Sequence, residues 1–270
     1  MNTNNHDIVV ARVLGNYTPP KSSRISRLTE LSYILEKEKE INFKRIWVLN
    51  RIFDTDYLND IKLLLEKFRH DHIEIPFLYN EYKPLGTFEH KFHYLTNINN
   101  ARNVAIKEGL SRGKYLFCLD GDCFFTSKLF DDICKGLTSD EGDFNYYALM
   151  AKRVPVENGK PDFDKLIDSE PMLAFTKASK EKFDESIPFG QNDKNDLCWR
   201  LGFNKDKMIN LIYDPNTSGN LCKTIGDIYH ISFSDPEIET NHDLRKSIRK
   251  KSKEDIIQIV KERYEGDDQP

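Results

Sequence analysis

Short apolar runs alternate with amphipathic helical stretches through the first 120 residues of the chain. The runs are rich in β-branched and aromatic residues and have the length of buried strands: 7–14, 45–53, 73–79 and 114–120. Between them, apolar residues recur at helical spacing among charged ones: 27–39, 57–69 and 97–111. Strand, helix and strand in this order form the βαβ unit of a parallel sheet, so the pattern predicts an α/β fold.

The second half of the chain alternates less regularly. Its strand-like runs are 146–154, 171–177, 207–213 and 227–233, and helices are predicted near 193–201 and from about 241 onward. No linker rich in Pro, Gly and Ser separates the two halves, so we expect one domain over residues 1–270. This domain would divide into 1–122 and 123–270, and the second part would end in a basic helix.

Composition argues against several classes of protein. Forty Lys and Arg residues against 44 Asp and Glu give a net charge of −4, which disfavours binding a polyanion by bulk electrostatics. No apolar run approaches the ~20 residues of a membrane-spanning helix, and the amino-terminal stretch has no secretory pattern. The five cysteines contain no C-x-x-C pair, so no disulfide framework or zinc ribbon is indicated. We expect a cytoplasmic protein.

Two carboxylates follow the apolar run at 114–120. Asp120 and Asp122 flank Gly121 at the predicted carboxyl end of a buried strand, which is where open α/β sheets bind ligands. Oxygen ligands suit Mn²⁺ or Mg²⁺, and such an ion can bridge a diphosphate and neutralise a departing phosphate. The glycine would let a ligand approach the backbone. A D-x-D sequence also occurs by chance in acidic loops, so the neighbouring sequence has to decide whether this one binds a metal.

That context is a resemblance over about thirty residues. Residues 98–126 resemble the segment of GT-A glycosyltransferases, family 2-like, in which an N-x-A-R-N helix precedes the D-x-D strand. The matching residues are Asn99, Ala101, Arg102, Asn103, Gly113, Tyr115, Leu119, Asp120 and Asp122. The resemblance implies a mixed, mainly parallel sheet flanked by helices and a nucleotide-sugar donor. It makes 1–122 the nucleotide-binding half and 123–270 the acceptor half. Ala105 stands where the family usually has glycine.

The resemblance also implies roles for individual residues. Asp120 would lie near the donor ribose or the metal, and Asp122 would coordinate the metal through the diphosphate. Arg102 and Asn103 would lie beside the nucleotide, with Asn99 and Gly121 in the same donor site. Taken without the resemblance, Arg102 is interpreted as part of an ion pair on a helix surface.

Polar residues near the ends of the first two predicted strands favour the same pocket. Arg12, and the pair Asn50 and Arg51, stand at polar breaks after apolar runs, where a nucleoside would lie in a GT-A sheet. An arginine suits a diphosphate because its planar fork donates two hydrogen bonds at once. Arginines that merely solubilise strand ends are the alternative interpretation.

An inverting transferase needs a carboxylate that removes a proton from the acceptor hydroxyl. Residues 188–203 resemble the glycosyltransferase segment in which an acidic pair precedes a D-L-x-x-R-L helix, which makes Asp193 the candidate base. Asn192 replaces one acid of the pair, and Lys194 follows Asp193 directly. Asp193 is equally suited to cap the helix that begins at Lys194. Glu170 is a competing carboxylate near the acceptor region.

Histidines offer a further ligand. Many GT-A enzymes carry a carboxy-terminal histidine that completes the metal site, and His230 ends a strand-like run, although a lone strand histidine is more often structural. The His70/His72 and His90/His93 pairs lack a Cys or third ligand nearby and are interpreted as solvated loop residues.

The segment 244–253 carries six basic residues and no acid. Such a run usually forms a solvated helix face. It is also suited to contact a diphosphate, an anionic acceptor or a membrane surface, because each presents clustered negative charge.

These patterns together predict a metal-dependent glycosyltransferase (EC 2.4, hexosyl- or pentosyltransferase) that uses a nucleotide-diphosphate sugar with Mn²⁺ or Mg²⁺. The acceptor stays open among a glycan, a lipid-linked glycan, a protein and a modified nucleic-acid base. One alternative is a catalytically silent binding module of the same fold. Another is a nucleotidyltransferase, which usually shows a Gly-rich or Lys-containing phosphate loop near the first strand, and residues 13–20 make a poor one.

Overall fold

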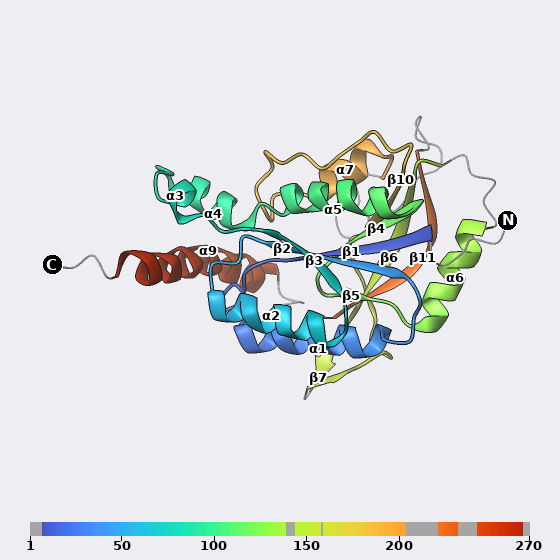
Figure 1. Cartoon of the computed structure of the whole chain (residues 1–270), viewed down its shortest axis with the longest axis horizontal. Coiled ribbons are helices and arrows are strands. Elements are labelled where there is room, and N and C mark those ends of the chain that lie inside the picture. Colours follow the sequence, from blue (N-terminus) through green and yellow to red (C-terminus); the bar gives the residue numbers. More distant parts are fainter. Residues whose placement is uncertain (1–6, 139–143, 158, 204–220, 232–241, 267–270) are drawn as a thin grey trace.

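The computed structural model describes residues 7–138, 144–157, 159–203, 221–231 and 242–266 of the 270-residue chain (Figure 1). Within them, nine strands form one sheet in the order β3-β2-β1-β4-β10-β6-β11-β5, with β9 paired to β6. Their bounds are β1 (Ile8–Leu14), β2 (Lys44–Asn50), β3 (Asp71–Ile75), β4 (Tyr115–Asp120), β5 (Cys123–Phe124), β6 (Tyr146–Val154), β9 (Ile167–Asp168), β10 (Met172–Thr176) and β11 (Cys222–Ile231). β7 (Val156–Glu157) and β8 (Lys160–Pro161) form a separate hairpin.

The sheet is mixed and mainly parallel, as predicted. β3, β2, β1 and β4 pair in parallel, and β10 runs antiparallel between β4 and β6. β11 then pairs in parallel with β6 and antiparallel with β5. The carboxyl ends of β2, β1, β4, β6 and β11 therefore meet at one edge of the sheet.

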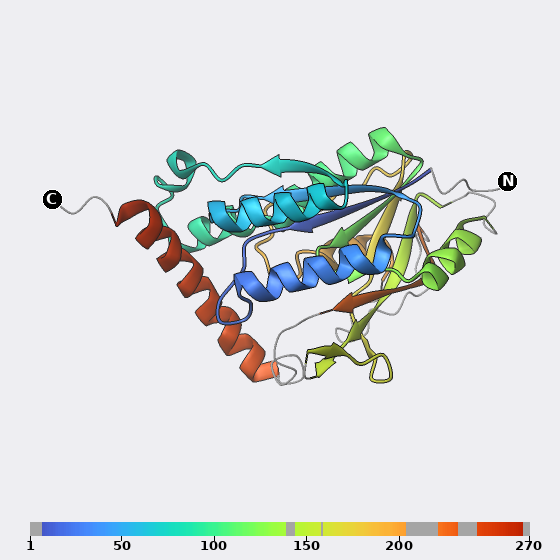
Figure 2. The ribbon, with the colours of Figure 1, turned by 60° about the horizontal axis from the view of Figure 1, so that its bottom comes forward.

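Helices cover both faces of this sheet (Figure 2). Their bounds are α1 (Arg24–Glu38), α2 (Thr55–Lys67), α3 (Tyr79–Tyr82), α4 (Phe88–Thr96), α5 (Ile98–Arg112), α6 (Ser127–Thr138), α7 (Asn195–Arg200) and α9 (His242–Glu265). α5 and α7 pack on one face, and α1, α2 and α6 pack on the other. Every residue of β1 is buried, as expected for a parallel strand covered on both sides.

α9 lies across the edge where the strands end (Figures 1 and 2). Its buried Ile256 and Val260 pack against Phe53, which follows β2, and against Tyr82 of α3 and Phe92 of α4. The predicted carboxy-terminal helix is thus present. Among the described helices, none is long and apolar enough to cross a membrane.

Two predicted strands end earlier than their apolar runs. β2 stops at Asn50, because Arg51 takes a positive φ of 47° and the chain turns there. β3 stops at Ile75, because Pro76 has no N–H to donate to a sheet. The predicted run 207–213 and the last two residues of 227–233 lie outside the described residues.

Candidate functional site

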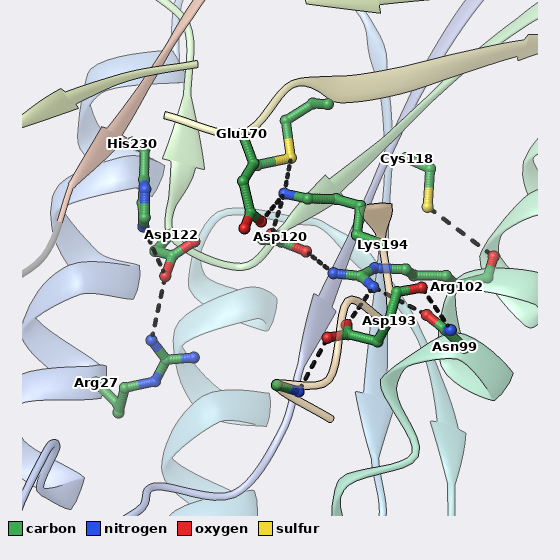
Figure 3. Close-up of polar contacts among 12 residues, drawn as sticks. Arg27, Asn99, Arg102, Cys118, Asp120, Asp122, Glu170, Asp193, Lys194 and His230 are labelled. Carbon is green, nitrogen blue, oxygen red and sulfur yellow. Dashed lines mark hydrogen bonds and ion pairs between the residues drawn. The ribbon is translucent and has the colours of Figure 1, made fainter. Parts of the chain in front are cut away.

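Arg102 joins two carboxylates at the carboxyl edge of the sheet (Figure 3). Its Nη2 donates to Asp120 Oδ1 at 2.7 Å, and its Nη1 donates to Asp193 Oδ2 at 2.9 Å. Arg102 projects from α5 and is buried, so the interpretation as a surface ion pair is wrong. A guanidinium held by two carboxylates fixes the orientation of both.

Lys194 links the same cluster to Glu170. Its Nζ lies 3.3 Å from Asp120 Oδ2, 3.4 Å from Glu170 Oε2 and 3.7 Å from Met172 Sδ. The side chain is only 7% exposed, whereas that of Glu170 is 54% exposed. Sequence analysis did not name Lys194 as a site residue. Its position directly after the candidate base Asp193 could have indicated that it lies in the site.

The charges of this cluster support one another. Burial raises the pKa of Asp120, but Lys194 and then Arg102 outweigh it and hold that pKa well below its ordinary value. Lys194 lowers the pKa of Glu170. Burial lowers the pKa of Lys194, but Asp120 and Glu170 outweigh burial, so that this pKa lies above its ordinary value. All three groups are therefore charged at neutral pH.

Asp122 points to the opposite side of the motif and meets His230 (Figure 3). Its Oδ2 lies 3.1 Å from His230 Nε2 and 3.7 Å from Arg27 Nη1 of α1. The antiparallel pairing of β5 with β11 sets this contact, because His230 pairs with Cys123. Burial raises the pKa of Asp122, but His230 and then Arg27 outweigh it, so the pKa lies below its ordinary range. Asp122 Oδ1 is buried and has no hydrogen-bond partner.

Gly121 is required by the chain itself. A Cβ there would lie 2.6 Å from the Val13 carbonyl oxygen and 2.6 Å from Leu14 Cδ2. The end of β1 fills the space that a side chain would need, and a contact of Gly121 with the donor stays a prediction.

Asp193 does not cap α7. The helix begins at Asn195, and its cap residue is Lys194, which makes no side-chain capping bond. Asp193 Oδ1 instead accepts from the Gly190 N–H at 2.9 Å, while Oδ2 accepts from Arg102. The N-cap interpretation is therefore wrong. Both carboxylate oxygens are used within the protein, and the side chain is 12% exposed.

Two asparagines of the N-x-A-R-N segment hold the chain between 183 and 193. Asn99 Nδ2 donates to the carbonyl oxygens of Asp184 and Asp193, and its Oδ1 accepts from Arg102. Asn103 makes a similar pair of bonds to the backbone of Phe183. α5 therefore fixes the segment that carries Asp193 and Lys194.

Arg12 lies inside β1 and not at a polar break after it. It is 1% exposed, its Nε donates to the Cys123 carbonyl oxygen at 2.8 Å, and its guanidinium pairs with Glu38 of α1. The guanidinium of Arg12 is therefore buried and ties α1 to the start of β5, and a contact of Arg12 with the donor stays a prediction.

Asn50 and Arg51 do lie at the carboxyl edge, where β2 ends. Arg51 Nη1 donates to Asn50 Oδ1 at 3.1 Å and to Asn100 Oδ1 at 3.2 Å. Its guanidinium also lies over the ring of Tyr94. These contacts place the pair beside the start of α5, one strand away from β1 and two from β4.

Comparisons with known proteins give similarities in structure alone, since no family model and no curated protein sequence matches the chain. The mannosyltransferase PcManGT from Pyrobaculum calidifontis, in complex with GDP-Man and Mn²⁺, is 11% identical with a TM-score of 0.45, over 95% of this chain and 66% of that one. A protein from Desulfovibrio desulfuricans G20 described as a nucleotide-diphospho-sugar transferase is 11% identical with a TM-score of 0.42, over 91% and 98%. The 4-diphosphocytidyl-2C-methyl-D-erythritol synthase from Anaerococcus prevotii is 15% identical with a TM-score of 0.38, over 90% and 100%. At these identities and scores, none of them assigns the chain to a family.

Proposed function

We propose that the chain is a GT-A-like glycosyltransferase that moves a sugar from a nucleotide-diphosphate sugar to an acceptor hydroxyl. The observation that carries the proposal is the pair Asp122 and His230, which converge at the carboxyl edge of the sheet beside the Arg102–Asp120–Lys194 cluster. Buried charges of this kind, gathered where α/β sheets bind ligands, are typical of functional sites.

The residues at Asp122 fit a divalent cation. A buried carboxylate oxygen without a partner, next to an imidazole, is a donor set that Mn²⁺ accepts. No group of three or more His, Cys, Asp and Glu side chains forms a metal cluster in the described part of the chain, so phosphate and water oxygens would complete the shell. Bound Mn²⁺ or Mg²⁺ would neutralise charge on the departing diphosphate. Asp120 is already held by Arg102 and Lys194, and we assign it to the donor ribose.

For the acceptor, we propose Glu170 as the base ahead of Asp193. Glu170 is the exposed carboxylate of the cluster, whereas Asp193 is buried with both oxygens paired. Glu170 would take the proton of the acceptor hydroxyl as its oxygen attacks the anomeric carbon and the bond to the diphosphate breaks. A nucleoside diphosphate leaves, and the sugar inverts its configuration.

A nucleotidyltransferase is the second candidate, and Lys21 is the observation that favours it. Lys21 lies in the loop between β1 and α1. The negative charge of Asp122 raises the pKa of its ammonium group, against the lowering by burial. A lysine there is the phosphate-loop feature that residues 13–20 lack. In that reaction pyrophosphate, and not a nucleoside diphosphate, would leave.

The experiment is to incubate the protein with nucleotide sugars, or with nucleoside triphosphates plus sugar phosphates, each with and without Mn²⁺. We expect Mn²⁺-dependent release of a nucleoside diphosphate from a nucleotide sugar. Release of pyrophosphate alone would favour the nucleotidyltransferase. Thermal stabilisation by a nucleotide without any turnover would favour a silent binding module. We also propose a cytoplasmic location and an acceptor that is a glycan, a lipid-linked glycan, a protein or a modified nucleic-acid base.

A further inference from the structure

A cleft lies at the amino ends of β2 and β3, on the edge of the sheet opposite the candidate functional site. Its volume is about 230 Å³. Pockets for drug-sized ligands begin at roughly 300 Å³, so this cleft suits a smaller molecule. The polar residues that line it are Lys44, Arg45, Arg69, His70, Asp71 and Arg112.

Positive charge predominates in this cleft. Among the residues that line it, four are Lys or Arg, and Asp71 is the one acid. His70 adds no charge at neutral pH, because burial lowers its pKa to about 4. Four positive charges therefore face one negative charge, which favours an anionic ligand.

Two of the four cations hold carbonyl oxygens at the ends of helices. Lys44 Nζ donates to the Arg112 carbonyl oxygen at 2.7 Å, where α5 ends. Arg45 donates to three carbonyl oxygens in the segment 38–43, where α1 ends. These bonds explain why both cations are present. Carbonyl oxygens carry no full negative charge, so Lys44 and Arg45 still add to the positive charge of the cleft.

Arg69 has no such explanation. Its side chain is exposed and makes no hydrogen bond, ion pair or ring contact with any described residue. Its φ of 56° is left-handed, a conformation that favours glycine. The turn that ends α2 imposes this conformation, because the N–H of Arg69 donates to the Glu66 carbonyl oxygen and that of His70 to the Leu65 carbonyl oxygen. Arg69 therefore costs stability without a contact of its side chain that offsets the cost.

Arg112 supplies a second guanidinium. Its Nη1 donates to Asp71 at 2.9 Å, and the Asp71 side chain is 72% exposed. An ion pair so exposed to solvent is weak, so Arg112 can bind a second anion at little cost. His70 adds a hydrogen-bond donor. Its Nδ1 accepts from Trp47 Nε1, which places the proton of the neutral ring on Nε2.

We propose that this cleft binds a small molecule through a phosphate group held by Arg69 and Arg112, at a site separate from the candidate functional site. Phosphate suits the two residues because a guanidinium donates two parallel hydrogen bonds to it. The group belongs either to free phosphate or to a small phosphate ester. The inference is independent of the proposed function, since open α/β sheets bind their substrates at the other edge, where the strands end.

The test is calorimetric titration of inorganic phosphate and of glycerol phosphate into the wild type, Arg69→Gln, Arg112→Gln and the control Lys107→Gln. Lys107 is an exposed cation of α5 that does not line the cleft. We expect each arginine variant to weaken binding about tenfold, as for the loss of a hydrogen bond to a charged group, and Lys107→Gln to stay within about twofold. Tighter binding of glycerol phosphate identifies an ester as the ligand, and equal binding identifies free phosphate.

Arg69→Gly separates binding from stability. Glycine takes the left-handed backbone without steric cost, so this variant should melt no lower than the wild type while it loses phosphate affinity as Arg69→Gln does. A lower melting temperature with unchanged affinity would show that Arg69 serves the fold, and would overturn the proposal. Two other results would also overturn it: no binding of either phosphate compound by the wild type, and equal affinity in Lys107→Gln and the two arginine-to-glutamine variants.

Discussion

At the scale of single residues, Lys194 is a buried cation that connects Asp120 to Glu170. Its ammonium group lies between these two carboxylates, and Asp120 also pairs with Arg102. Burying an ammonium group is costly, so its presence between two carboxylates indicates a position fixed by charge.

Lys194→Met should lower the free energy of unfolding by about 3 kcal/mol, because it leaves Asp120 with one cation. It should also move the acidic limb of the activity profile to higher pH. Lys194 lowers the pKa of Glu170, so without it this carboxylate is protonated at a higher pH. Urea unfolding and a pH–rate profile measure the two effects.

The exposed Lys177→Met is the control for that substitution. Lys194→Arg should keep most of the stability and of the pH profile, because it retains the charge. An unchanged acidic limb in Lys194→Met would remove Glu170 from the role of base.

His70 should make stability depend on pH. Its Nδ1 accepts from Trp47 Nε1 at 3.2 Å, and burial lowers its pKa to about 4. The unfolded chain takes up a proton near pH 6.5, so this stability is complete above that pH and is lost as pH falls through about 4. Between pH 7 and 4, the free energy of unfolding of His70→Gln should therefore fall by roughly 2 kcal/mol less than that of the wild type. Urea unfolding at both pH values measures this difference.

His72→Gln removes an exposed imidazole from the same segment and controls for the loss of a histidine as such. If His70→Gln loses stability with falling pH as steeply as the wild type does, the buried imidazole is not the cause.

At the scale of elements, the D-x-D turn is built against the end of β1. Gly121 has no room for a side chain there, since the Val13 carbonyl oxygen and Leu14 occupy the space. The turn is therefore packed closely against the end of β1, and Asp120 and Asp122 point to opposite sides of it (Figure 3).

Gly121→Ala should cost about 1–3 kcal/mol of stability and disturb the positions of both carboxylates. Thermal unfolding and nucleotide affinity should both decline. Gly15→Ala, where an added Cβ meets nothing within 4 Å, is the matched control and should change stability by less than about 0.5 kcal/mol. Equal melting temperatures for the two variants would contradict this account of the turn.

The elements themselves were predictable where local periodicity decides them. β6 occupies the predicted 146–154, and α1, α5 and β4 differ from their predictions by a few residues. The partners of polar side chains were not predictable, because they depend on contacts between segments far apart in the chain. Arg12 meets Cys123 through a separation of 111 residues, and Arg102 meets Asp193 through 91. Periodicity holds no information on such pairs.

At the scale of the whole molecule, the site lies on one edge of the sheet and draws on both halves of the chain. The first half supplies Asp120, Asp122 and Arg102, and the second supplies Lys194 and His230. The resemblance identified the motif Asp120–Asp122 and singled out His230, which contacts Asp122, while its role as a metal ligand stays a prediction. Lys194 and Lys21 were not identified, because neither belongs to the motifs that carry the resemblance.

The measurement that tests the central claim most directly is calorimetric titration of nucleoside diphosphates, with and without Mn²⁺, into the wild type and Asp122→Asn. We predict that Mn²⁺ strengthens binding to the wild type and that Asp122→Asn removes this gain, at a loss of roughly 10–100-fold, with metal-free binding nearly unchanged. Asp132→Asn, an exposed carboxylate on α6, is the control and should keep the Mn²⁺ effect. Equal Mn²⁺-dependent affinity in Asp122→Asn and the wild type would contradict the assignment of this edge as a metal-assisted phosphate site.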